Sequence, residues 1–249
     1  MISDRDQIVD HLKSLRMPTM RRSYEEMADK ARAESWGYEH YLLQLLDLEF
    51  EVRRQNRIER NLRTSRLPPS KTFENFDKKR LPIKVANHLN VLIDGSFLSR
   101  SENILAFGNP GSGKTHLLCA IGHELIAQGK QVLFIPCGHL VQDLLIAKRE
   151  LELTKKLKSL SRFDAVIIDD IGYVQQNREE MEVLFTFLAD RYEQSSLMIT
   201  SNLPFSKWEQ IFKDPMTTAA AIDRLVHHSI IFELNVESYR MEQAQKETK

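Results

Sequence analysis

The chain has 249 residues, enough for one α/β domain with a smaller helical part and a buried core. Its 35 Lys and Arg residues balance its 35 Asp and Glu residues, so net charge excludes no class of partner and only the distribution of charge is informative. The first residues are charged and no apolar run approaches the length of a membrane span, so we expect a soluble cytoplasmic protein with no membrane partner. Cys119 and Cys137 lie in apolar segments and are expected to be buried thiols, not a redox pair.

Residues 1–66 are predicted to be helical, because their apolar residues recur at helical spacing. The first helix ends before Pro18, the second covers 21–35, and the third begins near Glu39.

The third helix continues into a basic stretch. Residues 51–80 hold ten Lys or Arg against four acids, a local balance of +6. A helical stripe of arginines suits the phosphate backbone of DNA, and the alternatives are a solvated face or a surface that docks a neighbouring subunit. The candidate DNA contacts are Arg53, Arg54, Arg57 and Arg60. Leu67-Pro68-Pro69-Ser70 then marks the expected boundary between a helical domain, 1–68, and a nucleotide-binding domain, 69–249.

Two phenylalanines, Phe73 and Phe76, follow this boundary. They either anchor the core, which is the expected role, or lie near a bound adenine. A helix is predicted from Ile83 to Asp94.

The segment from Gly108 to Thr115 fits the phosphate-loop pattern G-x-x-x-x-G-K-[ST] at every fixed position. A short apolar strand, 104–107, precedes it, and an amphipathic helix, 116–128, follows it. An ordinary glycine turn is the alternative. The expected nucleotide contacts are Gly108, Asn109, Pro110, Gly111, Ser112, Gly113, Lys114, Thr115 and His116. In this motif Lys114 would reach the β- and γ-phosphates of ATP, and the Thr115 hydroxyl would coordinate Mg²⁺.

A second strand is expected at 131–136, and after a helix at 139–158 an apolar strand ends in Asp169 and Asp170. This is the Walker B arrangement, in which Asp169 would hold Mg²⁺ and Asp170 would orient or deprotonate the attacking water. The alternative is a buried strand that ends in a solvated acidic turn.

The remaining elements continue the alternation of strand and helix. A helix at 179–194 precedes a strand at 197–200, whose end carries Thr200, Ser201 and Asn202. These short polar side chains would either touch the γ-phosphate and its water or cap the next helix.

A helix at 217–228 and a last strand at 230–236 complete the prediction. His227 and His228 have no Cys or carboxylate partner at metal-ligand spacing, so we expect surface or core residues.

This order predicts an α/β doubly wound fold with a five-stranded parallel sheet and the ligand at the carboxyl ends of the strands. The motifs GNPGSGKTHL, FDAVIIDDIG, LMITSNLPFSKW and AIDRLVHHS resemble the AAA+ ATPases of the DnaC helicase-loader group. The segment YEHYLLQLLDLEFEVRRQNRIERNLRTSRLPPSKTFENFD is similar to the IstB family, the ATP-binding helper proteins of insertion sequences.

The resemblance implies an AAA+ P-loop fold, sensor 1 at Asn202, and at Arg224 an arginine finger acting on a neighbouring subunit of a homo-oligomer. It further implies assembly on duplex DNA and help to a transposase in DNA transposition, with hydrolysis driving disassembly. Two features depart from the usual pattern. First, Asp170 stands where most AAA+ proteins carry Glu, so we expect slow ATP hydrolysis that DNA or a partner stimulates. Second, we expect no C-terminal lid domain. Arg240 is an open candidate for the arginine of that lid.

Two alternatives use related chemistry. A DnaC-like loader acting on a replicative helicase would share the ATPase motifs. A small-molecule kinase would need a substrate lid, and no such insertion is evident.

Overall fold

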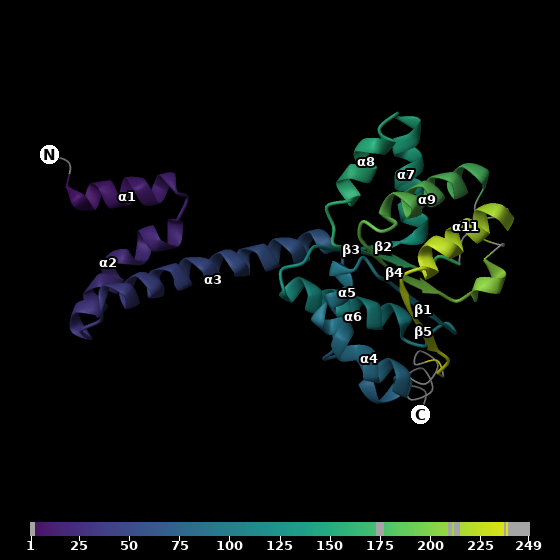
Figure 1. Ribbon diagram of the computed structural model, residues 1–249, viewed down its shortest axis with the longest axis horizontal. Coiled ribbons are helices and arrows are strands. Elements are labelled where there is room, and N and C mark those ends of the chain that lie inside the picture. Colours follow the sequence, from purple (N-terminus) through teal and green to yellow (C-terminus); the bar gives the residue numbers. More distant parts are fainter. Residues whose placement is uncertain (1–2, 173–176, 209–210, 212–214, 237, 239–249) are drawn as a thin grey trace, which may run out of the picture. The chain divides into compact units, whose positions relative to one another are not determined.

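The computed structural model describes residues 3–172, 177–208, 211, 215–236 and 238 (Figure 1). The chain divides into two compact units, residues 1–60 and 61–249. The division falls inside one long helix, α3 (Tyr38–Ser65). The functional boundary expected at residue 68 stays a prediction.

The N-terminal unit consists of α1 (Asp4–Ser14), α2 (Pro18–Ala33) and the larger part of α3. Pro18 begins α2 at a position where a missing N–H is harmless. The side chain of Glu49, from α3, accepts hydrogen bonds from the backbone N–H groups of Thr19 and Met20, at 2.8 and 3.0 Å. A buried carboxylate therefore caps the positive end of α2 and ties it to α3.

The second unit is built on a parallel sheet, as predicted. Its strands are β1 (Asn103–Gly108), β2 (Val132–Pro136), β3 (Ala165–Asp169), β4 (Ser196–Ser201) and β5 (Ser229–Leu234). Their order across the sheet is β2-β3-β4-β1-β5, and all four neighbouring pairs are parallel. The register sets Ile168 beside Ile199 and Phe107 beside Ser201, which aligns the carboxyl ends of β3, β4 and β1.

Helices cover both faces of this sheet (Figure 1). One face carries α4 (Ile83–Asp94), α5 (Ser96–Ser99) and α6 (Lys114–Ala127), and the other carries α7 (Cys137–Arg149), α8 (Leu153–Leu160), α9 (Arg178–Arg191) and α11 (Pro215–Val226). Two short 3₁₀ helices, η1 (Lys78–Arg80) and η2 (Phe205–Lys207), lie in the connections. The central strands are buried on both faces, and the predicted α/β fold is confirmed.

The single helix predicted over residues 139–158 is wrong: α7 and α8 are separate. Leu151, 94% exposed, lies between them with a left-handed φ of 59°. The break lets Leu153, Leu157 and Leu160 turn back onto the core, whereas a straight helix would carry them past the edge of the sheet.

Both cysteines are buried thiols outside any disulfide, as expected. Burial raises the pKa of the Cys119 thiol to about 12, which keeps it protonated and unreactive. Among the described residues, no helix combines the length and the apolar character that crossing a bilayer requires. Arg240 lies outside the described residues.

Candidate functional site

The glycine-rich loop joins the end of β1 to the start of α6, the context that its pattern requires. Gly111 and Gly113 adopt left-handed φ values of 82° and 92°, which other residues rarely reach. Gly113 directly precedes the first turn of α6, so the loop ends at the positive end of that helix.

The side chain of Lys114 folds back over this loop. Its ammonium donates hydrogen bonds to the carbonyl oxygens of Gly108 and Asn109, both at 2.8 Å, and the residue is only 7% exposed. An incoming phosphate would compete with these two carbonyls for the ammonium.

Three side chains from separate elements converge beside the loop. The hydroxyl of Thr115, in the first turn of α6, donates to Asp169 Oδ1 at 2.7 Å. The hydroxyl of Thr200, on β4, donates to the same oxygen at 2.8 Å. The oxygens gathered at Asp169 are of the type that Mg²⁺ prefers as ligands. A cation bound there would replace the hydrogen bond between Thr115 and Asp169.

Asp170 follows β3 in a left-handed conformation, with φ of 62°. Its backbone N–H donates to the Thr200 hydroxyl at 2.7 Å, which fixes the turn. Burial of the carboxyl, together with the negative charge of Asp169, raises the pKa of Asp170 above its ordinary value, and the nearby Lys114 ammonium only partly opposes this. A carboxylate with a raised pKa is better suited to accept a proton from water.

The polar residues at the end of β4 make different contacts. The Ser201 hydroxyl closes a local turn through the backbone of Leu203, and η2 begins without a side-chain cap. Asn202 Oδ1 is buried without a hydrogen-bond partner among the described residues, and a Cβ at Gly172 would lie 2.8 Å from it. Such an amide has an unfilled position for a water or a ligand.

Arg224, on α11, does not line the pocket at the phosphate loop. Its guanidinium lies 4.7 Å from the centre of the Phe185 ring, a cation–π contact with α9. Its Nη1 is buried without a hydrogen-bond partner among the described residues.

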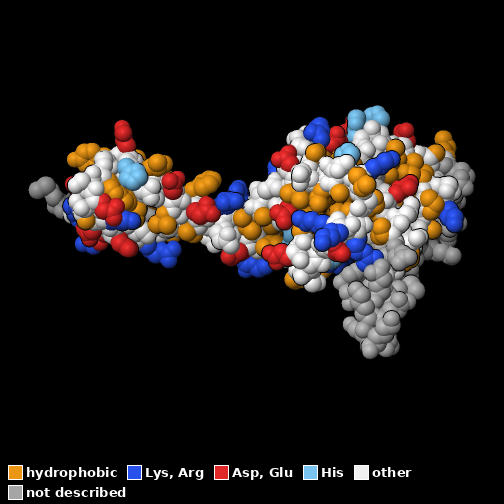
Figure 2. Space-filling model, turned by 90° about the horizontal axis from the view of Figure 1, so that it is seen from below, with side chains coloured by type: hydrophobic (Ala, Val, Ile, Leu, Met, Phe, Trp, Pro, Cys, Tyr) orange, Lys and Arg blue, Asp and Glu red, His pale blue; other side chains and the backbone are white. Residues whose placement is uncertain are grey.

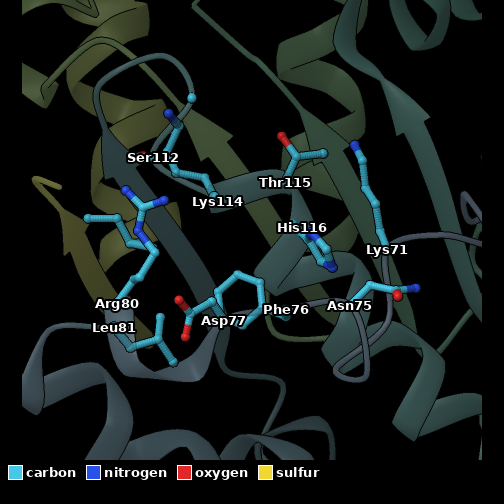
Figure 3. A pocket seen from close by; sticks show the side chains of 13 residues that line it. Lys71, Asn75, Phe76, Asp77, Arg80, Leu81, Ser112, Lys114, Thr115 and His116 are labelled. Carbon is cyan, nitrogen blue, oxygen red and sulfur yellow. The ribbon is translucent and has the colours of Figure 1, made fainter. Parts of the chain in front are cut away.

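A pocket of about 190 Å³ opens at the phosphate loop and α6 (Figure 3). Its other wall is the segment 71–81, and Phe76 lies against Gly113 and in edge contact with the His116 ring, at a centroid distance of 5.0 Å. His116 Nε2 lies 2.9 Å from the Thr72 carbonyl oxygen, which anchors this wall to α6. Phe76 is half-buried and lines the pocket, so its expected role as a core anchor is wrong.

Several polar residues of this wall belong to no motif in the sequence. Those that line the pocket are Lys71, Asn75, Asp77 and Arg80. In the sequence they appear only as part of a basic stretch. The hydrogen bond from His116 to the Thr72 carbonyl, which fixes the wall, joins residues 44 positions apart.

The four candidate DNA-binding arginines are all exposed on α3. Arg53 is paired with Glu49 at 2.7 Å and with the carbonyl of Arg16, and Arg54 is paired with Glu51 at 3.3 Å. On the face that Figure 2 draws, basic and acidic side chains of the N-terminal unit lie side by side. Arg53 therefore helps to hold the unit together whatever else it contacts.

The AAA+ class of P-loop ATP-binding proteins is defined by a sheet of this order with three features. These are a phosphate loop between β1 and α6, an acid at the end of β3 and a polar residue on β4. The fold is similar to nucleotide-bound DnaA from Aquifex aeolicus, at a TM-score of 0.58 and 17% identity over 74% of this chain and 56% of that one. It is also similar to the DnaC helicase loader, at a TM-score of 0.53 and 16% identity over 62% of this chain and 89% of that one.

The particular family follows from the sequence comparisons. Residues 10–247 match the family described as IstB-like ATP binding protein, and the chain belongs to that family. It is 44% identical to a putative insertion sequence ATP-binding protein of Sinorhizobium fredii, over 94% of this chain and 78% of the relative. It is 37% identical to the IS5376 putative ATP-binding protein of Geobacillus stearothermophilus, over 95% of this chain and 94% of that relative.

Proposed function

We propose that this protein is an ATP-dependent regulator of DNA transposition that assembles on duplex DNA, assists a transposase and disassembles when it hydrolyses ATP. The observation that carries the ATPase part is the hydrogen-bonded cluster of Thr115, Asp169 and Thr200 beside the phosphate loop. It brings the two expected Mg²⁺ ligands together at 2.7 Å, although they are 54 residues apart in the sequence.

ATP would lie in the pocket between the phosphate loop and the segment 71–81. The backbone N–H groups of residues 108–115 and the start of α6 would hold the phosphates, and Lys114 would exchange its two carbonyl partners for phosphate oxygens. Phe76 and His116 offer ring surfaces for the adenine. Mg²⁺, held by Thr115 and Asp169, would neutralise charge on the β- and γ-phosphates.

Hydrolysis would need three further residues. Asp170 would take the proton of the attacking water, and Asn202, whose amide oxygen has no partner among the described residues, would orient that water and the γ-phosphate. Arg224 would act on ATP held by a neighbouring subunit, after its guanidinium leaves the Phe185 ring. The short side chain of Asp170 supports slow hydrolysis.

The DNA and transposase roles rest on the family, whose members are named for insertion sequences. Arg57 and Arg60 are exposed on α3, beyond the paired Arg53 and Arg54. Contact with several phosphates would make DNA affinity fall with salt, with a logarithmic slope of about −0.9 per contact. An affinity that does not change with salt would contradict this part of the proposal.

Light scattering coupled to size-exclusion chromatography tests the assembly. Wild type, Lys114→Ala and the matched surface variant Lys158→Ala would be run with and without duplex DNA and a non-hydrolysable ATP analogue. We expect a large particle from wild type and Lys158→Ala only when both ligands are present, and none from Lys114→Ala. A wild-type protein that binds the analogue but stays small on DNA would overturn DNA assembly.

A pull-down from host extract, using the full chain with the ATP analogue, separates the proposed role from that of a helicase loader. The likeness to the DnaC loader concerns the fold alone, at 16% identity. Recovery of the transposase supports the proposal, and recovery of a replicative helicase instead would replace it.

A further inference from the structure

A second cluster of potential ligands lies away from the residues that line the phosphate-loop pocket. Glu193, His227 and His228 each offer one ligand atom, and these three atoms all lie within 4.8 Å of one another. Glu193 follows the end of α9, whereas the two histidines link α11 to β5. All three residues are exposed, so an ion could reach them from solvent.

The backbone around both histidines is fixed. The His227 N–H donates to the carbonyl of Asp223 at 2.9 Å, which closes the last turn of α11, and the His228 carbonyl accepts from the N–H of Asn103, on β1, at 2.7 Å. The two imidazole rings lie edge to face, with centroids 4.1 Å apart. The side chains thus start from an anchored junction and not from a free loop.

One ring has an additional hydrogen-bond partner. The Tyr192 hydroxyl lies 3.0 Å from His227 Nδ1. Partners of this kind orient metal-binding imidazoles and hold them in one tautomer.

The local electrostatics also favour a cation. The histidines follow the C-terminal end of α11, where unsatisfied carbonyls give a partial negative charge. Glu193 adds a full negative charge to the cluster.

We propose that Glu193, His227 and His228 form a binding site for one divalent transition-metal ion of the zinc type. Two imidazole nitrogens and one carboxylate oxygen are a donor set that suits Zn²⁺ and Co²⁺ and not Mg²⁺. Tetrahedral ligands at the usual Zn–N distance lie about 3.3 Å apart, so exposed side chains within 4.8 Å need only small rotations to close on an ion. Solvent water would occupy the fourth position.

The ion would join the end of α9 to the α11–β5 junction. Arg224 lies in α11, three residues before His227, so the site would stiffen the helix that carries Arg224. The metal site itself stands apart from the proposed ATPase role, because none of its residues lines the phosphate-loop pocket.

Calorimetric titration of the full chain with Zn²⁺, without nucleotide and in excess Mg²⁺, tests the proposal. Visible absorption of added Co²⁺ reports the coordination. The variants are His228→Ala and Glu193→Gln, and the matched control is His88→Ala, an exposed residue of α4 that bonds to the Lys84 carbonyl of its own helix.

We expect one equivalent of Zn²⁺ bound by wild type and His88→Ala, and binding at least tenfold weaker in His228→Ala and in Glu193→Gln. Co²⁺ should give visible bands of low-coordinate type in wild type that the two site variants lose. Melting curves recorded without metal should coincide for all four proteins. Absence of Zn²⁺ binding by wild type, or equal affinity in wild type and either site variant, overturns the site.

Discussion

At the scale of single residues, the Asp169 carboxylate organises the site. One of its oxygens accepts from both Thr115 and Thr200, and Thr200 in turn accepts from the backbone of Asp170. Four residues from three elements therefore share one hydrogen-bond network. The network leaves the Asp170 carboxyl half-buried beside a second negative charge, which is the physical source of its raised pKa.

The first prediction concerns Asp170. If this carboxylate accepts the proton of water, Asp170→Asn should lower kcat for ATP at least 100-fold while nucleotide binding is retained. The matched control is Asp47→Asn, at an exposed position of α3. Phosphate release and binding of a fluorescent ATP analogue measure the two effects.

The pH dependence follows from the same group. A carboxyl with a raised pKa becomes protonated at a higher pH than an ordinary aspartate. As the pH is lowered, wild-type kcat should therefore begin to fall at a pH above that at which an exposed Asp becomes protonated. A rate that stays flat through that range, or an Asp170→Asn protein of normal kcat, would argue against Asp170 as the base.

At the scale of elements, the join between α2 and α3 depends on one buried carboxylate. Glu49 caps α2 through Thr19 and Met20 and is paired with Arg53. Burial alone would raise the pKa of Glu49, but the hydrogen bonds from Arg53, Met20 and Thr19 outweigh it and the pKa is lowered. The helix pair is therefore stabilised by an ionised group.

The second prediction is that Glu49→Gln loosens this helix pair, since charged hydrogen bonds contribute about 1.5–3 kcal/mol. Hydrogen exchange of the α2 amides should rise about tenfold or more, with the α6 amides as an internal reference. Glu51→Gln, an exposed neighbour, should leave exchange unchanged.

The sign of the pH effect follows from the lowered pKa. The contribution of Glu49 is fully present above the pKa of the unfolded chain and is lost as pH falls through the lower pKa of the folded state. The difference in α2 exchange between wild type and Glu49→Gln should therefore shrink on acidification. A difference that grows instead would refute the assignment.

At the scale of the whole molecule, Arg224 and the phosphate loop are parts of separate surfaces. Arg224 is not among the residues that line the pocket, and its guanidinium contacts α9. The proposed contribution of Arg224 to hydrolysis therefore requires a second copy of the chain, and we expect the active species to be an assembly of subunits.

Mixing two inactive variants tests this arrangement. Lys114→Ala lacks a working nucleotide site but keeps Arg224, whereas Arg224→Ala keeps the site. A mixture on DNA should recover a substantial fraction of wild-type ATPase activity, because each Lys114→Ala subunit supplies an arginine to its neighbour. The control mixture replaces Lys114→Ala with the double variant Lys114→Ala/Arg224→Ala and should recover nothing. Equal activity in the two mixtures would rule out an arginine acting between subunits.

The sequence predicts features that are encoded locally. The phosphate loop is one contiguous pattern, and Asp169 is found because an apolar strand ends beside it. Arg191 is missed because two of its partners, the carbonyls of Leu160 and Phe163, are 31 and 28 residues away in the sequence, and the buried guanidinium reaches them only after the chain has folded. Glu193 is missed as a partner of His227 and His228 for the same reason: its carboxylate lies 34 residues before the first of the two histidines.

The resting contacts of Lys114 bear on the exchange of spent nucleotide. When a phosphate leaves, the carbonyls of Gly108 and Asn109 can take up the ammonium at once, at 2.8 Å each. The Lys114 ammonium is then not left as a bare buried charge, which would otherwise make the nucleotide-free state costly. We expect ADP to be replaced by ATP through this empty state by simple dissociation and rebinding, with no dedicated exchange factor.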